Sequence, residues 1–89
     1  MTNTRTSSSG RLFVVATPIG NLSDMTAHAI SCLKSVDIIA CEDTRTSSKL
    51  LNHFGITTKT WAYHDHNADT QRQKLLERLQ MGQTVALIS

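Results

Sequence analysis

The stretch VVATPIGNLSD, residues 14–24, decides how this chain folds. An apolar run stops at Pro18, passes through Gly20 and gives way to a helix-like pattern. Pro18 has a fixed φ and no amide hydrogen, so a central strand cannot continue past it, and Gly20 permits a close backbone approach. The stretch therefore predicts a strand, a tight loop and a helix. Such loops often hold a phosphate or a nucleotide-like cofactor, although the usual glycine-rich signatures are missing.

Strand-like and helix-like patterns alternate outward from this stretch. After a flexible tail at residues 1–10, we predict strands at 12–16, 36–42, 58–63 and 84–89 and helices at 24–34, 49–54 and 70–81. The strand at 12–16 is continuously apolar, as is typical of strands covered on both faces, and the strand at 36–42 is a second strand of the buried type. The order β-α-β-α-β-α-β predicts one α/β domain over residues 11–89, with three layers and a mostly parallel sheet between helices on both faces.

Capping residues mark the expected helix ends. Ser23 or Asp24 is suited to cap the first helix, and Ser47 or Ser48 the short second helix. Gly55 is expected to end that second helix in the left-handed conformation.

The composition is that of a small globular domain with little charge bias. Nine basic and seven acidic side chains give a formal net charge of +2, which does not argue for nucleic acid and does not exclude RNA. Cys32 and Cys41 lie outside any CxxC pattern, so we expect reduced, buried thiols. Residues 1–10 have no apolar signal region and no run approaches the roughly 20 apolar residues of a membrane span, so we expect a cytoplasmic protein.

The last run, TVALIS at residues 84–89, is largely apolar. Ligand loops in open α/β sheets follow the carboxyl ends of strands. The chain therefore stops where the next such loop would begin, and we expect it to be part of a longer protein. The alternative is a terminal strand at the edge of the sheet, but edge strands are normally blunted by charge or proline.

Polar stretches follow three of the predicted strands: TPIGN at 17–21, EDTRT at 42–46 and HDHN at 64–67. The carboxyl ends of parallel strands share one rim of a sheet, so these stretches are expected to converge on one site. Asp43 and Arg45 are suited to bind a ribose or a carboxylate, because carboxylates accept from hydroxyls and arginine binds anions. The alternative interpretation is a helix cap with a surface ion pair.

The HDHN stretch places Asp65 between two histidines, His64 and His66. On an extended backbone both imidazoles would share a face and could bind one metal, but no third ligand is evident and no metal site is predicted. One histidine could instead act as a general base, and a polar turn is the structural alternative. Trp61 and Tyr63 could stack a nucleotide base, although core packing is the stronger interpretation.

These motifs together resemble a known family. LFVVATPIGNLSDMTAHAISCLKSVDIIACEDTRTSSKLLNHFGI, followed by HDHN and VALIS, resembles the N-terminal domain of the ribosomal RNA small subunit methyltransferase I family, within the tetrapyrrole methylase superfamily. The resemblance covers residues 12–89. The superfamily commonly has a GxGPGD loop after its first strand. Here Pro18 and Gly20 correspond roughly to its Pro-Gly and the preceding glycines are lost, which is typical of RNA-modifying members and argues against a tetrapyrrole substrate.

The resemblance implies methyl transfer from S-adenosyl-L-methionine to the 2′-oxygen of a cytidine ribose in the decoding region of small-subunit rRNA. It implies two α/β domains with the cofactor in the cleft between them, and a homodimer. The strand ending at Ser89 would continue into an Asp-Ala-Gly-Thr-Pro-type cofactor loop. This chain would lack that loop and the second domain, so by itself it is expected to be inactive, with a partner chain covering its exposed strand edge.

The resemblance also implies roles for the polar stretches. One wall of the cofactor cleft would be formed by Thr17, Pro18, Ile19, Gly20 and Asn21. The neighbouring strand end would present Asp43, Thr44 and Arg45 to the cofactor or the RNA. The base that removes the hydroxyl proton would be one of His64, Asp65, His66 and Asp43.

Two other function classes remain open, a precorrin-type tetrapyrrole methylase and a non-catalytic nucleotide-binding module. A Rossmann dinucleotide binder needs G-x-G-x-x-G after its first strand, and a phosphate loop needs G-x-x-x-x-G-K-[ST]. Neither pattern occurs in the chain.

Overall fold

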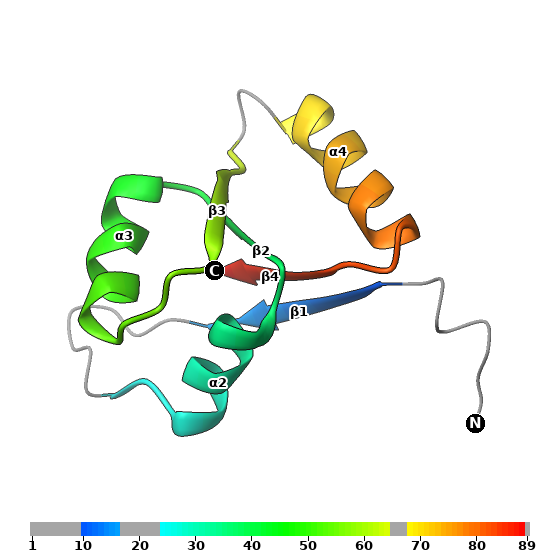
Figure 1. Cartoon of the computed structure of the whole chain (residues 1–89). Coiled ribbons are helices and arrows are strands. Elements are labelled where there is room, and N and C mark those ends of the chain that lie inside the picture. The colour runs from blue at the N-terminus through cyan, green and yellow to red at the C-terminus, as the bar shows by residue number, and fades with distance from the viewer. Residues whose placement is uncertain (1–9, 17–23, 65–67, 89) are drawn as a thin grey trace, which may run out of the picture.

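The computed structural model describes residues 10–16, 24–64 and 68–88, in which strands and helices alternate (Figure 1). All strand pairs in this part are parallel, in the order β1-β4-β2-β3. The predicted α/β class and element order are therefore confirmed. The elements are β1 (Arg11–Val15), α2 (Ala27–Ser35), β2 (Ile38–Cys41), α3 (Thr44–His53), β3 (Lys59–Ala62), α4 (Ala68–Gln80) and β4 (Thr84–Ile88).

Helices cover both faces of the sheet (Figure 1). Helices α2 and α3 bury Leu33 and Leu51 against one face, in a cluster that includes Ile39 of β2. Helix α4 packs Leu79 against the other face, over Val85 of β4. Successive strand residues point to opposite faces, which is why the central strands β2 and β4 are apolar at every position after Thr84. No helix within the described residues is long and apolar enough to cross a membrane.

The strand order corrects two expectations about the ends of the chain. β1 pairs with β4 alone among the described strands, and Leu12 and Val14 are 54% and 67% exposed, so residues 12–16 are not covered on both faces. β4 lies between β1 and β2 with Val85 fully buried, so the alternative of an edge strand at 84–89 is wrong. Both runs are mainly apolar, and apolarity alone does not tell which neighbours a strand will pair with.

Two helices begin at caps other than the predicted ones. Asp43 caps α3, so the helix starts five residues earlier than predicted and contains Ser47 and Ser48 as internal residues. Thr26 caps α2, where its side chain accepts a hydrogen bond from an amide of the first turn, so Asp24 is not the cap. In both helices the side-chain oxygen of the capping residue accepts a hydrogen bond from a backbone amide of the first turn, which has no partner within the helix.

Glycines sit at two places that a side chain would disturb. Gly55 follows α3 with a φ of 68°, which confirms the expected left-handed end of that helix. The Gly10 amide donates to the Leu79 carbonyl (2.6 Å), and a Cβ at Gly10 would lie 1.9 Å from the Gln83 carbonyl oxygen. The close approach of β1 to the end of α4 therefore requires glycine at position 10.

A reciprocal contact joins the amino ends of β2 and β4. The Thr84 amide donates to Oδ2 of Asp37 (2.8 Å), and the Asp37 amide donates to the Thr84 carbonyl oxygen (3.0 Å). The Thr84 hydroxyl also lies 3.1 Å from the same carboxylate oxygen. These bonds hold the register between two strands that are far apart in the sequence.

Candidate functional site

A cavity of about 590 Å³ opens at the carboxyl edge of the sheet. Three segments meet there: the turn from β2 into α3, the residues that follow β3, and the end of β4. Their convergence is what parallel pairing of β2 with both β3 and β4 requires. The volume lies within the usual range of small-molecule sites. The lining residues are Glu42, Asp43, Thr46, Ser47, Tyr63, His64, Leu87 and Ile88.

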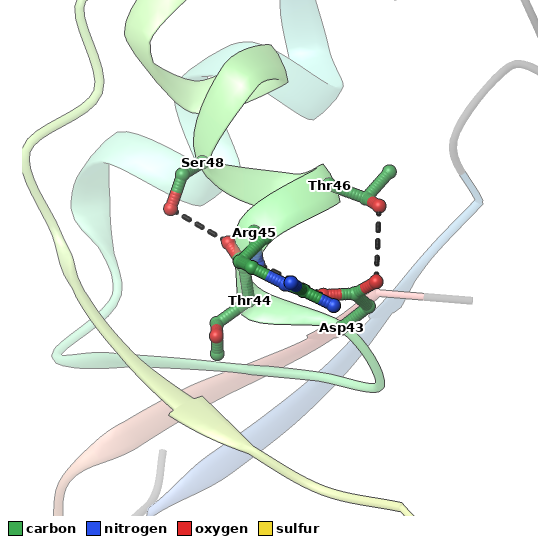
Figure 2. A network of polar contacts seen from close by, with 5 residues as sticks. All are labelled: Asp43, Thr44, Arg45, Thr46 and Ser48. Carbon is green, nitrogen blue, oxygen red and sulfur yellow. Dashed lines mark hydrogen bonds and ion pairs between the residues drawn. The ribbon is translucent and has the colours of Figure 1, made fainter.

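Asp43 caps α3, as Figure 2 shows, and it also belongs to the cavity lining. Its Oδ1 accepts from the Arg45 amide (3.0 Å), and its Oδ2 accepts from the Thr46 hydroxyl (3.2 Å). The hydrogen bond from the Arg45 backbone amide is the main reason that the pKa of this carboxyl is lowered. Hydrogen bonds from Thr46 and the positive charge of Arg45 lower it further by smaller amounts. Asp43 is therefore ionised at neutral pH, and a carboxylate has lone pairs to spare for a ligand hydroxyl.

Arg45 and Thr44 lie outside the cavity lining. The Arg45 side chain is 93% exposed and its Nε lies 3.8 Å from Oδ1 of Asp43, a surface ion pair of little energetic weight. The Thr44 carbonyl accepts from the Ser48 hydroxyl (2.6 Å), as Figure 2 shows. The structural alternative for this stretch, a cap with a surface ion pair, is thus present. Of the three residues predicted here, only Asp43 also lines the cavity.

Thr46 and Ser47 were not predicted as site residues, although helical periodicity could have found them. They follow Asp43 by three and four positions, so they lie on the same side of the first turn of α3. The prediction missed them because it started the helix at residue 49. Backbone amides at the amino end of a helix carry partial positive charge, so this side of the cavity combines hydroxyls with a favourable field for electron-rich ligand atoms.

His64 and Tyr63 form the wall on the β3 side. Both are half-buried, and the Tyr63 amide donates to the Cys41 carbonyl (2.7 Å), which extends the pairing of β3 with β2 by one bond. Asp65, His66 and the predicted cofactor stretch at 17–21 lie outside the described residues. Within the described part of the chain, no group of three histidine, cysteine or acidic side chains could hold a metal ion.

The Cys41 thiol lies buried beneath this edge. Burial raises its pKa and the negative charge of Asp43 raises it further, whereas a hydrogen bond from Ser47 acts in the opposite direction. Its Sγ lies 3.8 Å from the Trp61 carbonyl oxygen. A thiol with a raised pKa stays protonated at neutral pH and is a poor nucleophile, so Cys41 is a structural residue. Cys32 is also a free thiol and is half-buried.

The cavity can bind a ligand that carries hydroxyls, a positive charge and an apolar part. Two carboxylates, of Glu42 and Asp43, accept hydrogen bonds and attract cations, while Leu87 and Ile88 supply an apolar surface. His64 adds to the lining an imidazole, a group able to accept a proton.

Comparison with known proteins shows a family match along almost the whole chain. Residues 11–89 match the family described as Tetrapyrrole (Corrin/Porphyrin) Methylases. A protein of Synechocystis named ribosomal RNA small subunit methyltransferase I is 58% identical over 80 residues, which is 90% of this chain and 29% of the relative. Proteins of the same name from Halalkalibacterium halodurans and Escherichia coli O157:H7 are 55% and 51% identical, over 90% and 92% of this chain and 28% and 29% of the relatives. The chain thus spans less than a third of the length of these curated relatives.

Proposed function

The chain belongs to the tetrapyrrole methylase family, and from this premise we propose that residues 11–89 form the N-terminal α/β domain of an rRNA methyltransferase. The enzyme would use S-adenosyl-L-methionine to methylate the 2′-oxygen of a cytidine ribose in small-subunit rRNA. It would act in the cytoplasm, where ribosomal subunits are its partner, and as a homodimer. The cofactor, the nucleotide and the dimer go beyond what the relatives' names say.

The identity to named relatives carries the proposal: the chain is 50–58% identical to relatives that bear an rRNA methyltransferase name. The cavity agrees with it, because it lies at the carboxyl edge of a parallel sheet, where folds of this class bind their ligands. The identity extends along the segments that build this edge, since the matches cover 88–100% of the chain. Identity supports the reaction class, and the cavity supports a small-molecule cofactor.

The cavity residues fit S-adenosyl-L-methionine. Its ribose hydroxyls need acceptors, its sulfonium and amino groups are cationic, and its adenine ring needs apolar contact. The carboxylates of Glu42 and Asp43 would accept hydrogen bonds from the ribose hydroxyls and attract the cationic groups. Leu87 and Ile88 would supply apolar contact for the adenine ring. When bound, this cofactor supplies a methyl group already activated by the positive sulfur. The predicted residues 17–21 would complete the wall.

The protein's own contribution to the reaction is alignment and proton removal. The cavity walls must hold the ribose 2′-oxygen in line for attack, and such positioning supplies much of an enzymatic acceleration. A ribose hydroxyl is a poor acid, so a base must accept its proton. Among the candidates, Asp43 is weakened as a base because its pKa is lowered by the Arg45 amide. His64 also lines the cavity, which leaves it as the stronger candidate for the base among the described residues.

A calorimetric titration of S-adenosylhomocysteine into the complete enzyme, of which this chain would form the N-terminal part, tests the cofactor assignment, with ATP and NAD as controls. Selective one-site binding that is weakened in an Asp43→Ala variant supports it. An Arg45→Ala variant is the matched control, because Arg45 lies beside the cap but outside the cavity. Binding of NAD or ATP in place of S-adenosylhomocysteine would refute the assignment. If none of the three compounds binds, the assignment of a cofactor site to this edge of the sheet is refuted.

The base assignment needs turnover, and is tested by His64→Asn in the complete enzyme of which this chain would form the N-terminal part. Loss of a general base lowers the rate by roughly 10²- to 10⁴-fold. Methylation of small-subunit rRNA would be followed by transfer of a labelled methyl group. Turnover that is unchanged in His64→Asn and in the corresponding Asp65, His66 and Asp43 variants would show that the base lies elsewhere.

A tetrapyrrole methylase is the second candidate, because the matching family is described by corrin and porphyrin substrates. Parallel assays with small-subunit rRNA and with a precorrin-type substrate separate the two. Methylation of the tetrapyrrole alone would overturn the rRNA proposal while leaving the cofactor assignment in place.

A further inference from the structure

Lys59, Trp61 and Arg78 form a basic-aromatic cluster on strand β3 and helix α4, outside the cavity lining. Lys59 and Trp61 are alternate residues of β3, so their side chains project from the same face of the sheet. Nζ of Lys59 lies 5.9 Å from the centroid of the Trp61 ring, and Cζ of Arg78 lies 5.4 Å from it. Both distances fall within the range of cation–π attraction, which reaches about 6 Å.

Lys59 and Arg78 place two positive charges beside the Trp61 ring, and no described carboxylate forms a salt bridge with either of them. Arg72, one and a half turns away on the same helix, forms a salt bridge with Asp69. Neither Lys59 nor Arg78 forms a salt bridge within residues 10–16, 24–64 and 68–88. Two like charges held at one ring repel each other, and a bound anion removes that repulsion. The cluster is therefore built to receive negative charge.

The cluster leads directly to the candidate site. β3 pairs with β2 alone among the described strands, so no described strand occupies its other edge. Tyr63, which lines the cavity, follows Trp61 by two residues, about 7 Å along an extended backbone. An extended anionic chain that lies on this edge would pass from the cluster to the cavity mouth.

We propose that Lys59, Trp61 and Arg78 bind the phosphate backbone of single-stranded RNA and direct it toward the cavity at the carboxyl edge. The choice of RNA as the anion rests on the proposed function. Repeated phosphates suit two cations at fixed positions, and single-stranded RNA is the form that proteins bind with combined basic and aromatic side chains. The Trp61 ring packs against the buried cluster of Ile38, Ala40 and Val85, so it acts as the platform that holds the cations.

The test is the salt dependence of RNA binding. A fluorescein-labelled oligocytidine octamer is titrated with the protein at several salt concentrations, and binding is followed by anisotropy. The logarithm of the association constant falls with the logarithm of salt by about 0.7 per phosphate contacted on a single strand. The double variant Lys59→Gln/Arg78→Gln should flatten this slope by about 1.4 and weaken binding ~25-fold at 0.1 M salt. Trp61 is the only tryptophan of the chain, so its emission should change on binding.

Three controls decide the interpretation. Arg72→Gln removes a charge from the same helix that is already paired with Asp69, and should leave the slope unchanged. Lys59→Arg/Arg78→Lys keeps both charges and should retain the slope, which separates charge from folding defects. A DNA octamer of the same sequence should show the same loss in the glutamine variant, as expected of a backbone contact.

An unchanged slope in the glutamine variant, an equal effect of Arg72→Gln, or no binding of RNA by the wild-type chain would each overturn this proposal. None of these results would touch the cofactor assignment, which S-adenosylhomocysteine binding decides separately.

Discussion

Val14 and Val85 offer a direct test of the strand order. They are the same residue type on adjacent strands, and both point to the face of the sheet that α4 covers. Val85, in the central strand β4, is fully buried, whereas Val14, in the edge strand β1, is 67% exposed. Replacing each by alanine removes the same two methyl groups, so the difference between the two variants reports burial and little else.

The expected costs follow from burial. Two methyl-sized groups are worth about 1.6 kcal/mol of transfer free energy at ~0.8 kcal/mol each. The cavity left in the core adds to this, so Val85→Ala should lower the free energy of unfolding by roughly 2–3 kcal/mol. Val14 has only about a third of that surface to lose, so Val14→Ala should cost about 0.5 kcal/mol. In a domain of this size the larger change corresponds to a Tm decrease of roughly 10–20 °C.

Urea unfolding followed by circular dichroism measures both values, provided that the slope of the transition is the same in all variants. If Val14→Ala costs as much as Val85→Ala, β1 is covered on both faces and the sheet order described above is wrong. If neither variant loses more than about 0.5 kcal/mol, β4 is not central.

Three further predictions concern other parts of the structure. Gly10→Ala should lower the free energy of unfolding by roughly 1–3 kcal/mol, because its Cβ would lie 1.9 Å from the Gln83 carbonyl oxygen; thermal unfolding measures this, and unchanged stability would contradict the close approach. Because the folded-state pKa of Asp43 is lowered, its stabilising effect is present above the usual carboxyl pKa and lost as pH falls through the folded value. Asp43→Asn should reduce this acid-side loss in urea titrations at several pH values, and an identical pH profile would contradict it. Since burial raises its pKa, Cys41 should be alkylated by iodoacetamide more slowly than Cys32 until urea is added, as read by peptide mass spectrometry; equal rates in the native protein would show that Cys41 is accessible.

The candidate site was partly predictable. The ends of β2, β3 and β4 converge as expected because a parallel sheet puts them on one rim, and the predicted residues Asp43 and His64 both line the cavity there. Spacing alone could not tell whether Asp43 is a helix cap or a ligand-binding residue, and in the structure the same carboxylate caps α3 and lines the cavity. The assignments of Asp65, His66 and residues 17–21 stay predictions, since these positions lie outside the described residues.

The sequence by itself determined the order of elements and the class of fold. Periodicity and turn residues are local properties, read over a window of a few residues, and they suffice to give the order and type of the strands and helices, although not every helix start. Even the misplaced start of α3 had a local cause, since Asp43 and Ser47 are both good caps and only one can begin the helix.

Only the tertiary structure decided which strand is central and which side chains meet. The burial of Val85, the bonds between Asp37 and Thr84 and the meeting of Trp61 with Arg78 all join segments that are remote in sequence. Equal apolar runs are compatible with several strand orders, and the choice among them depends on pairing and packing summed over the whole sheet. That sum has no local signature, which is why the edge position of β1 and the basic-aromatic cluster became visible only in the folded chain.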